Sequence, residues 1–338
     1  MKSDKINILI TGGGSVMGQS LFRALNHSSF AEKINIYYTN SEPVCAAFAF
    51  NSTGFYKIPV IETFIVPVAK DKNFIPAIKK ICTDKNIDLV FGGTEHEIYA
   101  LAELKKENGF ENIVTGLDLK FVDITTDKYK LGCFFEKHNI EAPATDLYVN
   151  KKAFADKYGF PIIVKPRKSS ASRNILKINK AEAFPVQPFD NENNIILQEY
   201  IGSSAREYTV GCYLDSISQK DSYIIMERTL TVDGATGFGK VINDSKIYEY
   251  CKKIMRAFVD EGFKGGAFNI QLRLRNGISP EAFEINGRYS SSEGPRAKLG
   301  FNALEATIEN MIYHKSYDRF NPKIGSSFLR YYEEVFWL

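Results

Sequence analysis

FEINGRYSSSEG, residues 283 to 294, begins with the pattern of a buried β-strand and sets Glu284, Asn286 and Arg288 two residues apart. Residues two apart on an extended strand point the same way, so a carboxylate, an amide and a guanidinium share one face. The preceding run AFNIQLRLRN places Gln271 on a second alternating polar row. If these two strands pair through the turn at residues 277 to 280, the two polar rows converge.

Oxygen-bearing side chains in this arrangement have the chemistry of a Mg²⁺ site. Mg²⁺ is a hard cation that takes few protein ligands and fills its other positions with phosphate and water. An adjacent arginine would then neutralise a phosphate. A solvated strand face with an incidental Glu–Arg pair explains the spacing of these residues equally well.

The composition of the chain is that of an ordinary globular protein. Its 338 residues, 44% of them hydrophobic and 25% charged, are enough for two or three packed units. A formal net charge of +3 is too small to indicate a nucleic-acid-binding protein. No stretch approaches the ~20 apolar residues of a membrane span, and the start does not resemble a signal peptide. Five scattered cysteines favour reduced thiols. We therefore expect a cytoplasmic protein that binds neither nucleic acid nor membrane.

Strands and helices alternate up to about residue 120, which predicts a parallel sheet covered on both faces. In the remaining part the strands alternate between apolar and polar residues, which indicates antiparallel sheets with one face toward a cleft. The first part is expected to contain strands at 6–11, 34–40, 87–94 and 112–117, and helices at 16–25, 74–86 and 95–106.

Several motifs follow one another in a characteristic order. They are TTDKYKL at 125–131, IEAPATDLY at 140–148, FPIIVKPR at 160–167, LQEYI at 197–201, REYTV at 206–210, FNIQ at 268–271 and EINGR at 284–288. With these motifs the chain resembles the ATP-grasp superfamily, and in particular a single synthetase unit of the carbamoyl phosphate synthase large chain and its short relatives.

This resemblance implies a fold of the α/β and α+β classes, in which an ATP-grasp fold follows a Rossmann-like parallel-sheet domain. The implied domains are a Rossmann-like domain at 1–120, a small lid subdomain with its leading helix at 121–197, and a C-terminal subdomain with the metal and phosphate site at 198–338.

The resemblance also assigns roles to single residues. Lys128 and Lys165 match cations that hold nucleotide phosphates, and Arg288 matches the residue that faces the transferred phosphoryl group, so Arg288 and Lys165 are the predicted catalytic pair. The remaining assignments are Gln198, Glu199, Tyr200 and Ile201 at the adenine hinge, Glu207 on the ribose, and Gln271, Glu284 and Asn286 as ligands of Mg²⁺, for which Mn²⁺ is a substitute.

The implied reaction is an ADP-forming carboxylate–amine ligation, in which ATP first converts a small carboxylic acid into an acyl phosphate. The partners are then a small carboxylate and a small amine, and assembly as a homodimer is compatible with the sequence. Glu95 and Glu97, at the start of a predicted helix, are candidates for a substrate amine. Arg228 and Arg296 are candidates for the acceptor side, with Arg296 on the substrate carboxylate.

Three alternatives remain open from the sequence. A bicarbonate or carbamate kinase would use the same metal and phosphate site. A nucleotide-binding protein without catalysis is suggested only by the phosphate loop at 169–174, which contains no glycine where the family is usually glycine-rich. A second departure from the family is Gly287, which stands where many members have proline. An NAD(P)-dependent oxidoreductase is suggested by TGGGSVMG at 11–18. However, Asn40 ends the second strand where an acid usually holds an NAD ribose.

Overall fold

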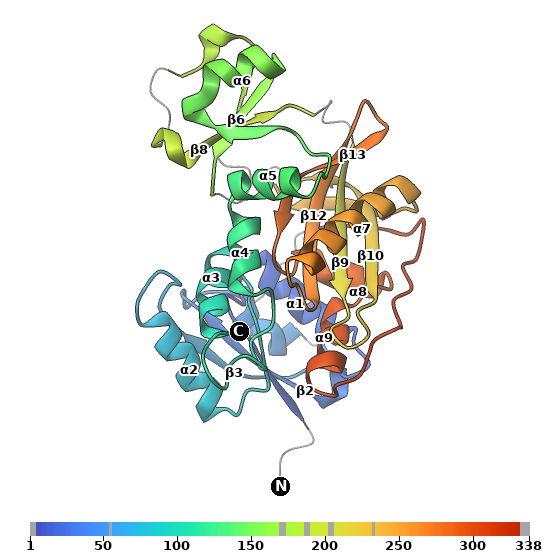
Figure 1. Ribbon diagram of the computed structural model, residues 1–338. Coiled ribbons are helices and arrows are strands. Elements are labelled where there is room, and N and C mark those ends of the chain that lie inside the picture. Colours follow the sequence, from blue (N-terminus) through green and yellow to red (C-terminus); the bar gives the residue numbers. More distant parts are fainter. Residues whose placement is uncertain are drawn as a thin grey trace.

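The computed structural model describes residues 5–53, 56–168, 174–185, 190–201, 206–231 and 234–331. Its strands form three sheets that occupy successive parts of the chain (Figure 1). All five cysteines have free thiols, as their scattered spacing predicts. Among the described helices, none is long and apolar enough to cross a membrane.

The first sheet is parallel, as predicted, with the strand order β3-β2-β1-β4. The prediction of a strand at 112–117 is wrong, because only Val114 pairs there, through a single bridge to Val90. The chain turns before this bridge, and Gly116 ends it with a φ of 97°. The elements of this part are β1 (Ile6–Ile10), α1 (Val16–Asn26), β2 (Ile34–Asn40), β3 (Val60–Ile65), α2 (Phe74–Asp84), β4 (Leu89–Phe91) and α3 (Glu95–Leu104).

The second sheet is small and antiparallel, with the strand order β5-β8-β6-β7. It stands apart from the other two sheets at the top of Figure 1, where α6 covers it. The elements are α4 (Leu119–Thr126), α5 (Lys128–Lys137), β5 (Thr145–Leu147), α6 (Lys151–Tyr158), β6 (Ile162–Pro166), β7 (Leu176–Ile178) and β8 (Ile195–Glu199).

The third sheet is large and antiparallel, with the strand order β13-β12-β9-β10-β11-β14. The antiparallel pairing in the second and third sheets agrees with the apolar–polar alternation of their strands. The elements are β9 (Glu207–Leu214), β10 (Asp221–Leu230), β11 (Thr236–Val241), α7 (Ser245–Asp260), β12 (Gly266–Arg275), β13 (Ser279–Asn286), α8 (Glu293–Lys298), α9 (Ala303–Met311) and β14 (Ser327–Leu329).

The two strands that carry the polar rows form the predicted hairpin. Gln271 on β12 lies opposite Glu284 on β13, and Asn269 lies opposite Asn286. Gly287 follows directly, and a Cβ atom there would lie 2.2 Å from Oγ1 of Thr125 on α4. The absence of a side chain at residue 287 therefore allows the end of β13 to pass close to α4.

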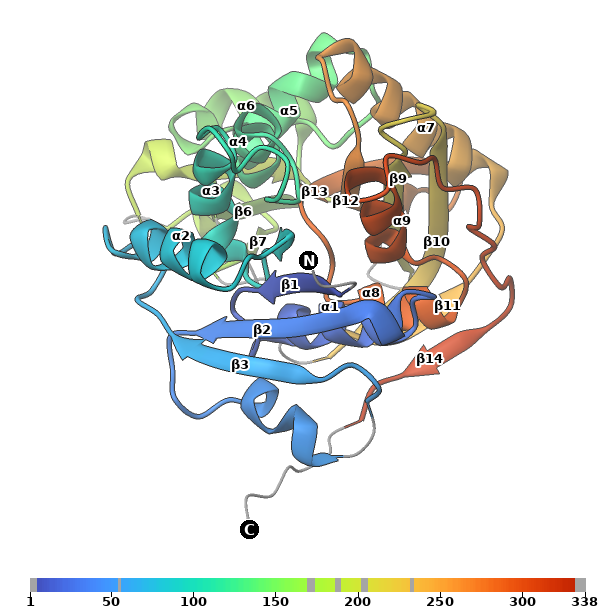
Figure 2. The ribbon, with the colours of Figure 1, turned by 90° about the horizontal axis from the view of Figure 1, so that it is seen from below.

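Two hydrophobic cores cross the predicted domain boundaries. The first sheet shares a core with β10, β12 and α9, and α1 packs beside α8 (Figure 2). The helices α4 and α5, predicted to belong with the small sheet, instead pack in the core of the large sheet, where Phe121 stacks on Phe258 at 5.3 Å. The predicted boundary between residues 197 and 198 falls inside β8, which pairs wholly within the small sheet.

Candidate active site

A cavity of about 740 Å³ lies where the three sheets meet. Its wall is built from β6, β7 and β8 of the small sheet, from β9 to β13 of the large sheet, and from the residues that begin α1 and α3. This volume is typical of a site for a ligand of nucleotide or drug size.

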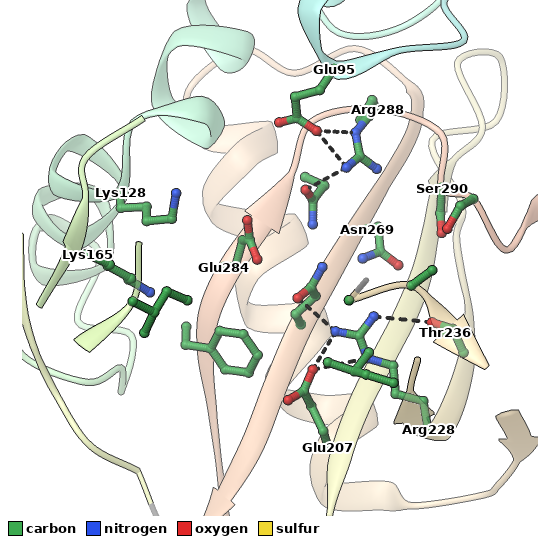
Figure 3. Close-up of a pocket in the computed structure, with 18 of the residues that line it drawn as sticks. Glu95, Lys128, Lys165, Glu207, Arg228, Thr236, Asn269, Glu284, Arg288 and Ser290 are labelled. Atoms are coloured by element: carbon green, nitrogen blue, oxygen red, sulfur yellow. Dashed lines mark hydrogen bonds and ion pairs between the residues drawn. The ribbon is translucent and has the colours of Figure 1, made fainter. Parts of the chain in front are cut away.

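Two lysines form a cationic wall on one side of the cavity. Lys128 is the first residue of α5, which the Asp127 carboxylate caps by accepting from the backbone N–H of Tyr129 at 3.1 Å. Lys165 lies on β6, and its ammonium group donates to Gln198 Oε1 at 2.8 Å. Figure 3 shows both lysines on the side of the cavity that faces Glu284.

At another end of the cavity, the buried carboxylate of Glu207 is held by two arginines, and Figure 3 shows one of them, Arg228. Arg228 donates from Nε to Glu207 Oε1 at 3.1 Å, and Arg273 donates to Oε2 at 2.9 Å. Arg228 also donates to Gln271 Oε1 at 2.8 Å and to Thr236 Oγ1 at 3.3 Å. Every guanidinium nitrogen of Arg228 therefore has a protein partner, and its contact with a substrate stays a prediction.

Arg288 lies at the far end, just after β13, and contacts the first part of the chain. Its Nε donates to Glu95 Oε2 at 2.7 Å, and Nη2 lies 2.6 Å from the same oxygen. Nη2 also donates to Asn286 Oδ1 at 3.0 Å, and Nη1 donates to the Tyr289 carbonyl oxygen at 3.1 Å. Every guanidinium nitrogen of Arg288 therefore has a protein partner, as in Arg228, and its contact with a phosphoryl group stays a prediction. The ion pair joins the first turn of α3 to the end of β13 (Figure 3).

The predicted adenine hinge lies between the small and the large sheet. Glu199 ends β8, accepts from the Ala144 N–H at 2.8 Å and pairs with Arg275 at 3.2 Å. The Lys177 ammonium lies 3.9 Å from the ring centre of Tyr200. Residues 202–205 beyond the hinge, and 169–173 of the predicted phosphate loop, lie outside the described residues.

No protein-family model matches this sequence, and no curated protein matches it. Solved structures do match. The L-amino acid ligase of Bacillus licheniformis superposes with a TM-score of 0.68 at 14% identity, over 94% of this chain and 78% of that one. N5-carboxyaminoimidazole ribonucleotide synthetase of Thermotoga maritima gives 0.67 at 16% identity, over 95% and 79%. The biotin carboxylase domain of Hydrogenobacter thermophilus 2-oxoglutarate carboxylase, solved with MgADP, ADP and bicarbonate, gives 0.70 at 12% identity, over 95% and 73%.

These three proteins are ATP-grasp enzymes. This chain has the ATP-grasp fold. The fold expected from the order of the motifs is thereby confirmed.

Most residues predicted for the ATP-grasp site line this one cavity, although their roles stay predictions. They are Lys128, Lys165, Gln198, Glu199, Tyr200, Ile201, Glu207, Arg228, Gln271, Glu284, Asn286 and Arg288.

Glu97 and Arg296, both predicted to contact substrate, do not line the cavity. Glu97 is buried beneath the glycine turn, where its Oε2 accepts from Thr11 Oγ1 at 2.8 Å, and its burial raises the pKa of the carboxyl group. Arg296 is only 1% exposed and pairs with Glu293 at 3.0 Å. The predicted substrate contacts of Glu97 and Arg296 are corrected to structural roles, because neither side chain reaches the cavity.

Asn269 also lines the cavity, in the same alternating row as Gln271, although it is not among the predicted site residues. Its Oδ1 accepts from Arg296 Nη2 at 2.5 Å and from Thr209 Oγ1 at 2.8 Å, so the amide is held from behind. The signal was present in the sequence, because Asn269 is two residues from Gln271 on an alternating strand.

The side-chain oxygens of Gln271 on β12 and of Glu284 and Asn286 on β13 are suitable ligands for Mg²⁺. The carboxylate of Glu284 makes no hydrogen bond or ion pair within the described part of the chain, and its register partner Gln271 adds an amide oxygen. The oxygens of Gln271 and Asn286 each accept from an arginine, but an amide oxygen has a second lone pair. Asn286 Nδ2 is buried without a partner among the described residues, which suits a donor to a bound phosphate.

The described segments contain no group of three or more His, Cys, Asp or Glu side chains that could hold a metal ion. Glu284, Gln271 and Asn286 would thus hold Mg²⁺ with one carboxylate and two amides. Few protein ligands and a phosphate are the usual environment of this ion.

Binding of a nucleotide phosphate should weaken as the pH rises through about 8. Burial lowers the pKa of Lys165 to about 8, and the charges of Lys128 and Arg273 act in the same direction. A phosphate favours the ammonium form, so proton loss above this pH removes the attraction. We expect the affinity for ADP, measured by calorimetry, to fall about tenfold between pH 8 and pH 9.5.

In Lys165→Arg, whose guanidinium stays charged over this range, the affinity for ADP should change little with pH. An equal fall in the wild-type protein and in Lys165→Arg would contradict the assignment of Lys165 to the phosphates.

Proposed function

We propose that this protein is an ADP-forming carboxylate–amine ligase that uses MgATP to convert a small carboxylic acid into an acyl phosphate. The proposal rests chiefly on one observation: a single cavity brings together the two lysines, the uncommitted carboxylate of Glu284 and the guanidinium of Arg288. Phosphoryl transfer is catalysed mainly by such positioned charges.

The names of similar structures support the nucleotide and the reaction class. Two of them are called ligase or synthetase, and a third was solved with MgADP. The identities are only 12 to 16%, so these names suggest the reaction class, and the main support for the proposal comes from the residues of this chain.

In the proposed reaction, Lys128 and Lys165 bind phosphate oxygens of ATP, and Glu207 accepts from ribose hydroxyls. Arg288 faces the terminal phosphoryl group, where it stabilises charge as a substrate carboxylate oxygen forms its bond to phosphorus and ADP leaves. Glu284, Gln271 and Asn286 would hold Mg²⁺, which would supply positive charge to the phosphates. An amine then attacks the acyl carbon, a C–N bond forms, and inorganic phosphate and a proton are released.

The proposed scheme needs no covalent nucleophile from the protein. The described cysteines are buried or lie outside the cavity lining, and His96 is the only histidine among the described lining residues. The substrate's own carboxylate oxygen therefore accepts the phosphoryl group in the proposed scheme.

The test is nucleotide turnover across a panel of carboxylic acids, with and without amines and with bicarbonate alone, followed by ³¹P NMR. We expect ADP and inorganic phosphate to form when a suitable acid and amine are both present. Formation of AMP and pyrophosphate would contradict the proposal. Turnover with bicarbonate alone would instead indicate the kinase, and tight MgATP binding without any turnover would indicate a binding protein.

A further inference from the structure

We propose that Glu95 and Arg288 together recognise a zwitterion, so that the acid activated by ATP is an α-amino acid. Its carboxylate would bind to Arg288, and its ammonium group to Glu95. This inference rests on the proposed function and names the class of its carboxylate substrate. It starts from the ion pair that these two side chains make at one end of the cavity.

The pair is placed so that a ligand can enter between its members. Glu95 comes from α3 and Arg288 from the end of β13, so the two side chains belong to different sheets. Their side chains are 26% and 20% exposed, and both line the cavity. Both members are therefore reachable from the cavity, and a ligand that separates them must supply each with a new partner of opposite charge. A zwitterion would replace one ion pair with two.

Glu95 is the acidic group of the cavity with most capacity left for an ammonium ion. Both oxygens of Glu207 are held by arginines, and Glu199 pairs with Arg275. Glu284 is proposed as a ligand of Mg²⁺. Glu95 uses only Oε2, and within the described residues its Oε1 makes no hydrogen bond or ion pair.

The cavity that contains this pair has several small lining residues, which suits a small substrate. Ser15 and Ser290 line the cavity with short side chains and Gly93 lines it with none, and a Cβ atom on Gly93 would lie 2.0 Å from the Thr11 carbonyl oxygen. Val16, which begins α1, is 46% exposed and also lines the cavity. It offers an apolar surface to the side chain of an amino acid.

This arrangement also decides which group reacts. A carboxylate on Arg288 lies at the end of the strand that carries Glu284, where the phosphoryl group is proposed to be transferred. The ammonium group on Glu95 stays protonated and has no lone pair, so it cannot attack. The amino acid is therefore the acyl donor: its carboxylate oxygen forms the bond to phosphorus while ADP leaves. A second amine then forms the C–N bond, as phosphate and a proton depart.

The experiment measures ADP release from MgATP with each proteinogenic L-amino acid and with its desamino counterpart, such as propionate for alanine, with hydroxylamine as the amine. We expect at least one amino acid to be preferred over its counterpart by about tenfold or more in kcat/KM, because loss of a charged hydrogen bond has this effect. In Glu95→Gln, KM for that amino acid should rise about tenfold while KM for ATP stays the same.

Glu103→Gln is the matched control, because Glu103 lies on the same helix, is exposed and pairs with Lys106 outside the cavity. It should leave both KM values unchanged. Activation of desamino acids as efficient as that of amino acids, or an equal effect of Glu95→Gln on both classes, would overturn the zwitterion site and leave the ligase intact. No ADP release with any acid would overturn the ligase itself.

Discussion

Glu284→Gln should largely abolish ATP-dependent phosphoryl transfer while the protein still folds. Glu284 is the one carboxylate among the proposed metal ligands, and its side chain has no hydrogen-bond or ion-pair partner within the described part of the chain. Its charge is therefore free for the metal, and the amide of glutamine is a weaker ligand of the same shape. We expect kcat for ADP release to fall by about 100- to 1000-fold, as for the loss of other groups that stabilise transition-state charge.

Glu249→Gln makes the same chemical change on α7, where the side chain is exposed and outside the cavity, and should keep full activity. Circular dichroism and thermal unfolding should show that both variants are folded. Normal turnover in a folded Glu284→Gln protein would disprove the metal assignment.

Arg296→Met should cause a large loss of stability, although the residue never reaches the cavity. Arg296 and Glu293 form an ion pair whose side chains are 1% and 4% exposed, and Arg296 also donates to Asn269 and Thr209. Removing the arginine leaves a buried carboxylate without its counter-charge. We expect the free energy of unfolding, measured with urea, to fall by about 3–5 kcal/mol.

Two further variants define this effect. Lys253→Met removes an exposed pair with Glu141 and should cost less than about 1 kcal/mol. The double variant Arg296→Met/Glu293→Leu removes both buried charges and should recover part of the loss. If Arg296→Met unfolds at the same urea concentration as the wild type, the buried pair does not stabilise the fold.

The parts of the fold that follow from local periodicity could be predicted from the sequence. Alternation alone placed Gln271 and Glu284 on facing rows, and the hairpin pairs them directly. The parallel first sheet likewise follows from its short apolar strands between helices. Side-chain direction in a strand depends only on neighbouring residues, so such a pattern needs no knowledge of distant contacts.

The errors arose where distant contacts decide the outcome. Arg296 lies in a motif rich in glycine and charge, but α8 carries it beneath the sheet onto Glu293 and Asn269. Glu97 has the position of a helix-start acid, yet the glycine turn of another element buries it. The strand expected around Val114 had suitable composition, but only one residue finds a partner.

The ion pair between Glu95 and Arg288 also could not be predicted from local sequence patterns, because the two residues are 193 positions apart in the chain. The sequence predicts a separate role for each residue, Glu95 for a substrate amine and Arg288 for a phosphoryl oxygen. Only the meeting of the first and third sheets brings them together and suggests one substrate for both.

The most direct test of the central claim is the transfer of oxygen from the carboxylic acid to phosphate. An accepted acid is labelled with ¹⁸O in its carboxylate and incubated with the protein, MgATP and an amine, and the released phosphate is analysed by mass spectrometry. Activation as an acyl phosphate predicts one ¹⁸O atom in each phosphate, because the C–O bond of the acid breaks when the amine attacks. Amide formation with phosphate that carries no ¹⁸O would contradict the claim.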